Sequence, residues 1–175
     1  MSQNNAEVNL QEFSKDLNLK DLAFDANLTC ILGIDDAFSL HLTYEPNSDR
    51  LYLYCPILDG LPQDEATRLK LYEALLESSM LGAQMAGGGA GVAIKEGLIL
   101  MHATLDMNAA EPTSLRRFSP VFVEAVERWR KKAKDIVDGN DPGATGVPGG
   151  KAPETSSFRR DPKELGVKGG GFMKI

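Results

Sequence analysis

The sequence predicts an α+β domain in the order α-βββ-α-ββ-α, with a twisted antiparallel sheet. Apolar residues recur at three- and four-residue steps in three segments, which is typical of helices facing a core. Between these segments, apolar and polar residues alternate as in half-buried strands, and the intervening turns are short, which favours antiparallel pairing. With 175 residues, of which 42% are hydrophobic, the chain can form one ordinary domain.

The first helix is predicted from a capping pattern. Asn9 is placed to cap the helix, with Glu12 three residues later to complete a capping box. We expect the helix to end at Asn18 or Lys20. The apolar stripe follows the spacing i, i+3, i+7 and consists of Leu10, Phe13 and Leu17.

Three strands are expected over residues 28–34, 38–44 and 51–55. The two cysteines, Cys30 and Cys55, fall in the first and the third of them. Cys30 and Cys55 can form a disulfide only if the first and the third strands pair. Buried free thiols are the favoured interpretation, as expected in a reducing compartment.

A second helix is expected over residues 65–86, capped by Asp64 and ended by the glycines at 87–89. Because its apolar residues extend around much of its circumference, it must bury more than one face, and a partner subunit is a natural cover for the second face. These apolar residues are Leu69, Leu71, Tyr72, Leu75, Leu76, Met80, Leu81 and Met85.

A hairpin over residues 92–105 and a last helix complete the domain. In that helix, Pro120 either produces a kink or occupies the first helical position after a Ser119 cap. A basic cluster at 128–134 lies opposite the apolar face and is interpreted as a solvated surface. The apolar face consists of Phe118, Phe122, Val126, Trp129, Ala133 and Ile136.

The chain is therefore divided into a domain at 1–138 and a tail at 139–175. The tail holds nine of the 17 glycines and four of the nine prolines, so we expect it to be disordered. Residues 1–138 carry 13 basic and 21 acidic residues, a net charge of −8 within a chain of net charge −6. This balance argues against binding to nucleic acid or to anionic membranes.

The residues offer no catalytic or metal site, so no cofactor is expected and the chain is predicted not to be an enzyme. The glycine run at 87–91 follows a helix and precedes a strand, which is the wrong polarity for a phosphate-binding loop. His41 and His102 are isolated within strands, and no nucleophile motif is present. The sequence also contains no secretory signal and no apolar run long enough to cross a membrane. We therefore expect a cytoplasmic protein that binds another protein.

Two segments carry a family resemblance: FSLHLTYEPNSDRLYLYCPILDGLP at 38–62 and LYEALLESSMLGAQMAGGGAGVAIKEGLILMH at 71–102. Together with the order of elements, they resemble the class I type III secretion chaperones, the CesT/SycE-like Tir chaperone family, and look closest to the Slc-type chaperones of chlamydiae. The resemblance runs from about residue 6 to 137. Pro120 departs from it by interrupting a helix that the family keeps continuous, and the tail has no clear counterpart.

The resemblance implies a cytoplasmic bacterial homodimer that binds the N-terminal segment of secreted effector proteins and keeps it partly extended. The secretion-system ATPase or sorting platform would be a further partner. The alternative is a regulatory or adaptor protein that uses the same dimeric fold to sequester a non-effector partner. The implied effector-binding residues are Leu10, Phe13, Leu17, Phe24, Leu28, Cys30 and Leu32. The implied dimer-interface residues are Leu75, Ser79, Leu81, Val92 and Ile94.

Overall fold

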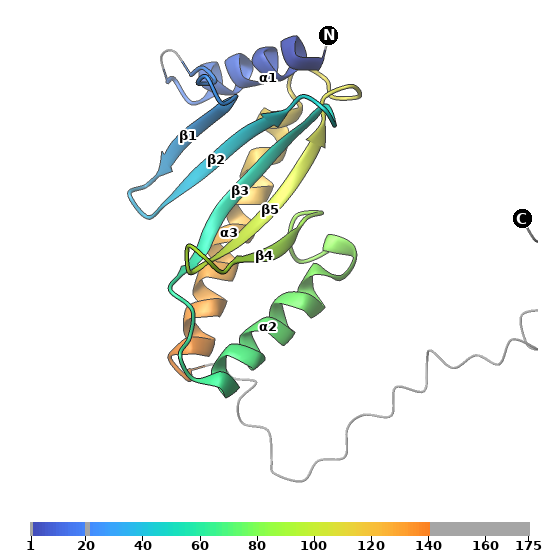
Figure 1. Cartoon of the computed structure of the whole chain (residues 1–175). Helices are drawn as coiled ribbons and strands as arrows, with labels where there is room; N and C mark the ends of the chain where they lie inside the picture. The colour runs from blue at the N-terminus through green and yellow to red at the C-terminus, as the bar shows by residue number, and fades with distance from the viewer. Residues whose placement is uncertain (1, 20–21, 141–175) are drawn as a thin grey trace, which may run out of the picture. The chain divides into compact units, whose positions relative to one another are not determined.

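The computed structural model describes residues 2–19 and 22–140, and it confirms the predicted α+β order (Figure 1). Most of the tail predicted at 139–175 lies outside the described residues. No described helix is long and apolar enough to span a membrane. The elements are α1 (Ser2–Asp16), β1 (Thr29–Ile34), β2 (Phe38–Glu45), β3 (Arg50–Asp59), α2 (Glu65–Ser79), the short 3-10 turn η1 (Met80–Gly82), β4 (Gly89–Ala93), β5 (Leu98–Asp106) and α3 (Ser114–Val137).

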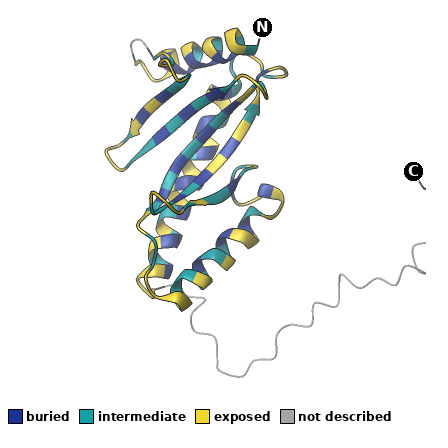
Figure 2. Cartoon of the chain, in the orientation of Figure 1, coloured by how far each residue is buried: buried dark blue, intermediate teal, exposed yellow. Residues whose placement is uncertain are grey.

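The five strands form one antiparallel sheet in the order β1-β2-β3-β5-β4. Alternate residues point to opposite faces, and one set is buried along each of the long strands (Figure 2). The buried set packs against α3, which runs behind the sheet in Figure 1, and no described helix lies over the face turned to the viewer. The core therefore lies between the sheet and α3, and buried residues of α1 and α2 extend it.

The position of β2 settles the state of the two cysteines. Cys30 is paired with Leu42 of β2, and Leu42 is paired in turn with Leu53 of β3. Since β2 separates β1 from β3, Cys30 and Cys55 lie on strands that do not pair, and both are buried free thiols. The favoured interpretation is confirmed. Burial raises the pKa of the Cys55 thiol to about 12, so this thiol stays protonated.

The prediction that Asn9 caps α1 is wrong, because α1 begins seven residues earlier, at Ser2. Asn9 lies in the middle of α1 and is completely buried. Its side-chain Nδ2 donates to the carbonyl oxygen of Asn5 at 3.0 Å, and its Oδ1 accepts a hydrogen bond from the backbone N–H of Leu115 at 3.0 Å. Leu115 is the second residue of α3, so Asn9 supplies the missing N-terminal cap of that helix.

Two further boundaries differ from expectation. Pro120 is the seventh residue of α3, which begins at Ser114, so the proposed start at Ser119 is wrong. The second helix ends at Ser79, not at residue 86, because Met80 is extended, with ψ of 119°, and Leu81 is left-handed, with φ of 59°. The chain then folds back tightly: a Cβ added at Gly88 would lie 1.8 Å from the carbonyl oxygen of His102, so only glycine fits there.

Candidate functional site

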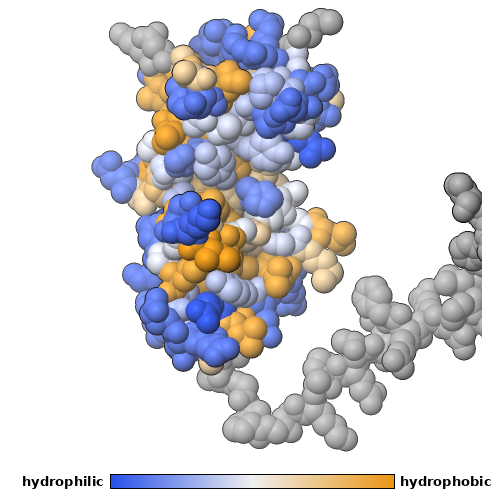
Figure 3. All heavy atoms as spheres, viewed as in Figure 1, coloured by the Kyte–Doolittle hydropathy of each residue, from blue (hydrophilic) through white to orange (hydrophobic). Residues whose placement is uncertain are grey.

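The first exposed apolar region lies between α2 and β4, and we call it the α2–β4 surface. The side chains of this surface are largely exposed to solvent. Leu81 is 95% exposed, and Ile94 is 77% exposed. In the space-filling view, hydrophobic atoms gather over β4 and the turn that follows α2 (Figure 3). The large exposed side chains that define the surface are Leu76, Met80, Leu81, Val92 and Ile94.

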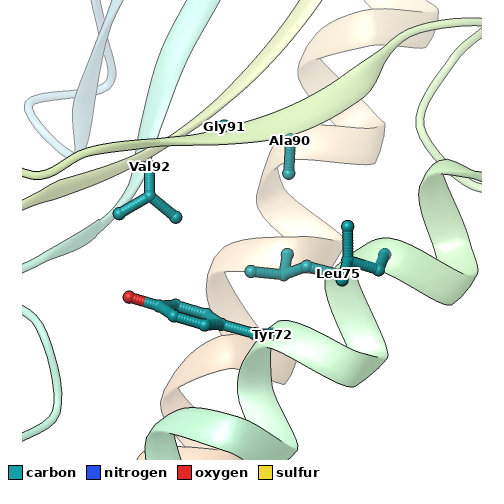
Figure 4. A pocket seen from close by; sticks show the side chains of 6 residues that line it. Tyr72, Leu75, Ala90, Gly91 and Val92 are labelled. Atoms are coloured by element: carbon teal, nitrogen blue, oxygen red, sulfur yellow. The ribbon is translucent and has the colours of Figure 1, made fainter.

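A pocket of about 140 Å³ opens in the α2–β4 surface (Figure 4). Side chains from α2 form one wall, and the backbone and small side chains of β4 form the other. None of the lining residues is ionisable at neutral pH, and cavities of about 150 Å³ accommodate a benzene-sized apolar group. The lining residues are Tyr72, Leu75, Leu76, Ala90, Gly91 and Val92.

Ser79 fixes the spacing between the two walls. Its Oγ donates to the carbonyl oxygen of Leu75 at 2.8 Å and accepts a hydrogen bond from the backbone N–H of Ala90 at 3.1 Å. The side chain of Ser79 therefore joins the end of α2 to the start of β4 within one protomer. This contact gives the pocket a fixed shape.

The five residues predicted for a dimer interface thus occupy different positions. Leu75 and Val92 meet at the pocket, and Leu81 and Ile94 stand exposed beside it. Ser79 is engaged in internal hydrogen bonds. The prediction did not include Leu76 and Met80 among the interface residues, although both belong to the apolar circumference that the sequence had indicated for the second helix.

The second region, which we call the α1 groove, lies between α1 and the segment that leads into β1. Its pocket has a volume of about 380 Å³. The apolar part of its lining consists of Leu10, Leu22, Phe24 and Leu28, and the polar part consists of Gln3, Glu7, Gln11 and Asp25. A neighbouring pocket, also of about 380 Å³, continues the groove along α1 past Ser14 and Lys15.

The α1 groove ends next to an edge strand, because Leu28 lines the groove and β1 begins at Thr29. β1 is the terminal strand and pairs only with β2 among the described elements. Ile31 is 59% exposed on this strand, while its neighbours Cys30 and Leu32 are 6% exposed. Asp25 orders the turn before β1, because its Oδ1 accepts hydrogen bonds from the backbone N–H groups of Asn27 at 2.8 Å and Thr29 at 2.9 Å.

Of the residues predicted to bind an effector, Leu10, Phe24 and Leu28 come together in the α1 groove. Phe13, Cys30 and Leu32 are buried in the core, and Leu17 is 43% exposed just beyond the end of α1. The prediction omitted Leu22 and Ile31. Ile31 could not be recognised from the pattern, because the apolar residues of β1 are consecutive and do not reveal which of them point outward.

Within the described residues, no group of three or more histidine, cysteine, aspartate or glutamate side chains is placed to hold a metal ion. His41 stacks on Tyr54, with ring centroids 4.9 Å apart, and its Nε2 lies 2.8 Å from the hydroxyl of Ser39. Burial lowers the pKa of His41, so its ring is neutral at physiological pH. These contacts account for His41 as a sheet residue.

Known structures share this fold. The chain is similar to the solved HopA1-SchA chaperone-effector complex, with 26% identity, a TM-score of 0.61, and coverage of 75% of this chain and 97% of the other. The type III secretion chaperone SycH of Yersinia pestis, solved with a stable fragment of YscM2, matches with 17% identity and a TM-score of 0.54, over 70% of this chain and 98% of the other.

The ExoT-SpcS complex from Pseudomonas aeruginosa matches with 15% identity and a TM-score of 0.52, over 71% of this chain and 96% of the other. The last two similarities demonstrate the shared fold. No curated protein sequence matches the chain. The sequence profile of the Tir chaperone protein (CesT) family matches residues 8–130, and the chain therefore belongs to the Tir chaperone protein (CesT) family, as its sequence resemblance implied.

Proposed function

We propose that this protein is a type III secretion chaperone that binds the N-terminal segment of a secreted effector and keeps it partly extended. Membership of a chaperone family supports this role and agrees with the prediction that the chain is not an enzyme. The similar structure with 26% identity is a complex of a chaperone with an effector. The observation that carries the proposal is the α1 groove, whose lining extends to Leu28, the residue before the edge strand β1.

This arrangement suits an extended polypeptide for a physical reason. The free edge of β1 offers backbone hydrogen bonds to an added strand without regard to its sequence, while the groove accepts apolar side chains. Glu7 and Asp25 lie in the lining, so the groove favours a segment in which basic residues accompany apolar ones.

The α2–β4 surface is the proposed homodimer interface. Burying a large aliphatic side chain contributes about 1.5–3 kcal/mol, and each protomer exposes five such residues there. Ten partly exposed side chains in a symmetric pair therefore give a gross gain on the order of 10–20 kcal/mol, which is comparable with or larger than an association cost of about 4–15 kcal/mol. An isologous contact between two copies of this surface is the simplest way to cover it.

Leu81 and the pocket fit such a contact. In an antiparallel pair of α2 helices, residues at equal distances from the twofold axis face each other. In such a pair, Leu81, which protrudes just after α2, would meet the pocket residues Leu75 and Leu76 of the second copy. The strained backbone of Leu81 and its 95% exposure then have a common explanation, because the turn presents this side chain to the pocket.

The function is tested by genetic deletion and complementation in the native bacterium. Loss of the protein should remove one or more proteins from the secreted fraction while their transcripts persist. Phe24→Asp should fail to restore secretion, because it places a charge in the apolar part of the groove. The control Val121→Asp, at a position 56% exposed on α3, should restore it. An unchanged secreted fraction after deletion would refute the proposal.

The proposed setting is the bacterial cytoplasm, where an effector is held before export. The ATPase or sorting platform of the secretion system is the proposed recipient of the chaperone–effector complex. The acidic balance of residues 1–138 supports a role in which basic effector segments are bound in preference to nucleic acid.

A further inference from the structure

A third pocket lies between the end of β3 and the second half of α3, and we call it the α3 basic pocket. It has a volume of about 440 Å³. Ile57 is 2% exposed and forms its apolar floor with the half-buried Leu58. The remaining lining residues are Asp59, Arg130, Lys131 and Lys134, so three cations and one carboxylate surround an apolar floor.

Arg130 is held rigidly at this pocket. Its Nη1 donates to the carbonyl oxygen of Pro56 at 2.8 Å, and its Nη2 donates to the carbonyl oxygen of Ala37 at 3.0 Å. The guanidinium also lies over the ring of Phe38, 5.1 Å from its centroid. These partners are uncharged, so they orient the guanidinium and leave its positive charge uncompensated.

The two lysines are exposed and are not neutralised within the described part of the chain. Neither Lys131 nor Lys134 has an ion pair with any residue of 2–19 or 22–140, although Asp59 lines the same pocket. By contrast, Arg128 pairs with Glu124 at 3.8 Å, and Lys132 lies over the ring of Trp129 at 4.5 Å. Among the cations at 128–134, Arg128 alone has an ion pair within the described residues, so the three cations that line the pocket are uncompensated.

The close spacing of these cations does not by itself stabilise α3. Arg130 and Lys134 are four residues apart, and Lys131 and Lys134 are three residues apart. Each like-charged pair at such a spacing on a helix costs about 0.2–0.5 kcal/mol. The helix dipole favours a cation only in the last turn, where Lys134 lies, and so does not account for the other two. Five of the 13 basic residues of 1–138 lie at 128–134 in an otherwise strongly acidic domain.

We propose that the α3 basic pocket binds an acidic segment of a partner protein, with carboxylates on Lys131 and Lys134 and an apolar side chain against Ile57 and Leu58. The net charge of −8 over residues 1–138 opposes a long polyanion such as nucleic acid, whereas a short acidic segment can remain within the basic region. Charge complementarity and the apolar floor together specify the chemistry of the partner.

This site is separate from the surfaces that carry the proposed function. α1 contacts the start of α3 through Asn9 and Leu115, while the pocket involves residues 130–134. At 1.5 Å per residue, these two parts of α3 are roughly 22 Å apart along the helix. The pocket shares no lining residue with the α1 groove or with the pocket between α2 and β4, so an acidic partner can bind while an effector segment occupies the groove.

The test is an NMR titration of the full chain with a short peptide that carries glutamates on both sides of a Phe-Leu pair. We expect amide shifts at residues 57–59 and 130–134, and at least a tenfold loss of affinity in the double variant Lys131→Glu/Lys134→Glu. The matched control Arg128→Glu/Lys132→Glu makes the same change in net charge on the same helix outside the pocket, and should lose less than threefold.

Two further measurements make the result decisive. A peptide with glutamine in place of glutamate should bind far more weakly, and thermal unfolding should establish that both double variants remain folded. The proposal is overturned by equal losses in the two double variants, which would indicate an effect of net charge alone. It is also overturned by shifts centred on the α1 groove, or by an absence of shifts at millimolar peptide.

Discussion

Leu81 provides the most direct test of the proposed dimer. One substitution should have a small effect on an isolated protomer and a large effect on a dimer that buries this residue. Its backbone adopts φ of 59° and its side chain is 95% exposed. A left-handed conformation costs a non-glycine residue about 1–2 kcal/mol. In an isolated protomer, Leu81→Gly removes this strain and loses about 0.5–1 kcal/mol through the greater freedom of glycine in the unfolded chain. The free energy of unfolding of the protomer should therefore change by about 1.5 kcal/mol or less.

If Leu81 is buried by a second copy, the same substitution removes two leucine contacts from each dimer. With about 1.5–3 kcal/mol for each, the loss is about 3–6 kcal/mol. This corresponds to a rise of the dimer Kd by about 10²- to 10⁴-fold, since about 1.4 kcal/mol is a factor of ten. Leu81→Asn should have a similar effect, because asparagine tolerates the left-handed conformation without supplying an apolar side chain.

Analytical ultracentrifugation over a concentration series measures this Kd directly. The control Val121→Ala removes an exposed aliphatic side chain from α3 and should leave the Kd unchanged. Wild-type protein that sediments as a monomer of 19.0 kDa at micromolar concentration would contradict the dimer. A wild-type dimer whose Kd is unaffected by Leu81→Gly would refute the contact assigned to Leu81 and leave the dimer itself standing.

Three other outcomes follow from the structure. Asn9→Ala should destabilise the fold by about 1–3 kcal/mol in urea unfolding, because it leaves the buried N–H of Leu115 without its acceptor; a change under about 0.5 kcal/mol would contradict the remote cap. Hydrogen bonds from Ser2, the larger cause, and from Tyr44 lower the pKa of Asp49. This carboxylate therefore stabilises the folded state above its unfolded pKa near 3.8, and the stabilisation is lost as pH falls below that value. Asp49→Asn should reduce the dependence of the urea midpoint on acid pH, and an unchanged pH profile would contradict this role of Asp49. The thiol of Cys55, with a pKa of about 12 and no exposed surface, should react with a thiol reagent at pH 8 only as the protein unfolds, and rapid labelling of the folded protein would contradict this.

The order of helices and strands was predictable because the spacing of apolar residues and the residue types at turns are local features of the sequence. Leu40, Leu42 and Tyr44 alternate with polar neighbours, and the structure buries all three on one face of β2. The role of Asn9 was not predictable from the same kind of information. A capping box is a local signal, whereas the N–H that Asn9 accepts belongs to a residue 106 positions later. Only the packing of α1 on α3 brings the two groups together.

The exposed apolar surfaces of the candidate site were predictable by element and less so by residue, and β1 and α2 show why. In β1, apolar residues are consecutive, so the sequence does not distinguish the exposed Ile31 from the buried Cys30 and Leu32. In α2, the apolar residues indicate two apolar faces, but the turn at Leu81 ends the helix before residue 86. A left-handed leucine has no sequence signature, because the conformation is disfavoured for that residue and is imposed by its surroundings.

The two apolar surfaces differ in a way that supports the different partners proposed for them. The pocket between α2 and β4 is lined by residues that carry no charge at neutral pH, and exposed Leu81 and Ile94 stand beside it. Long-lived interfaces between identical subunits have this character, because an uncovered apolar surface of this kind is a liability for a free monomer. The α1 groove mixes apolar and acidic residues, so it can remain solvated when empty. The first surface therefore suits a permanent second copy, and the second suits an effector segment that must later be released for export.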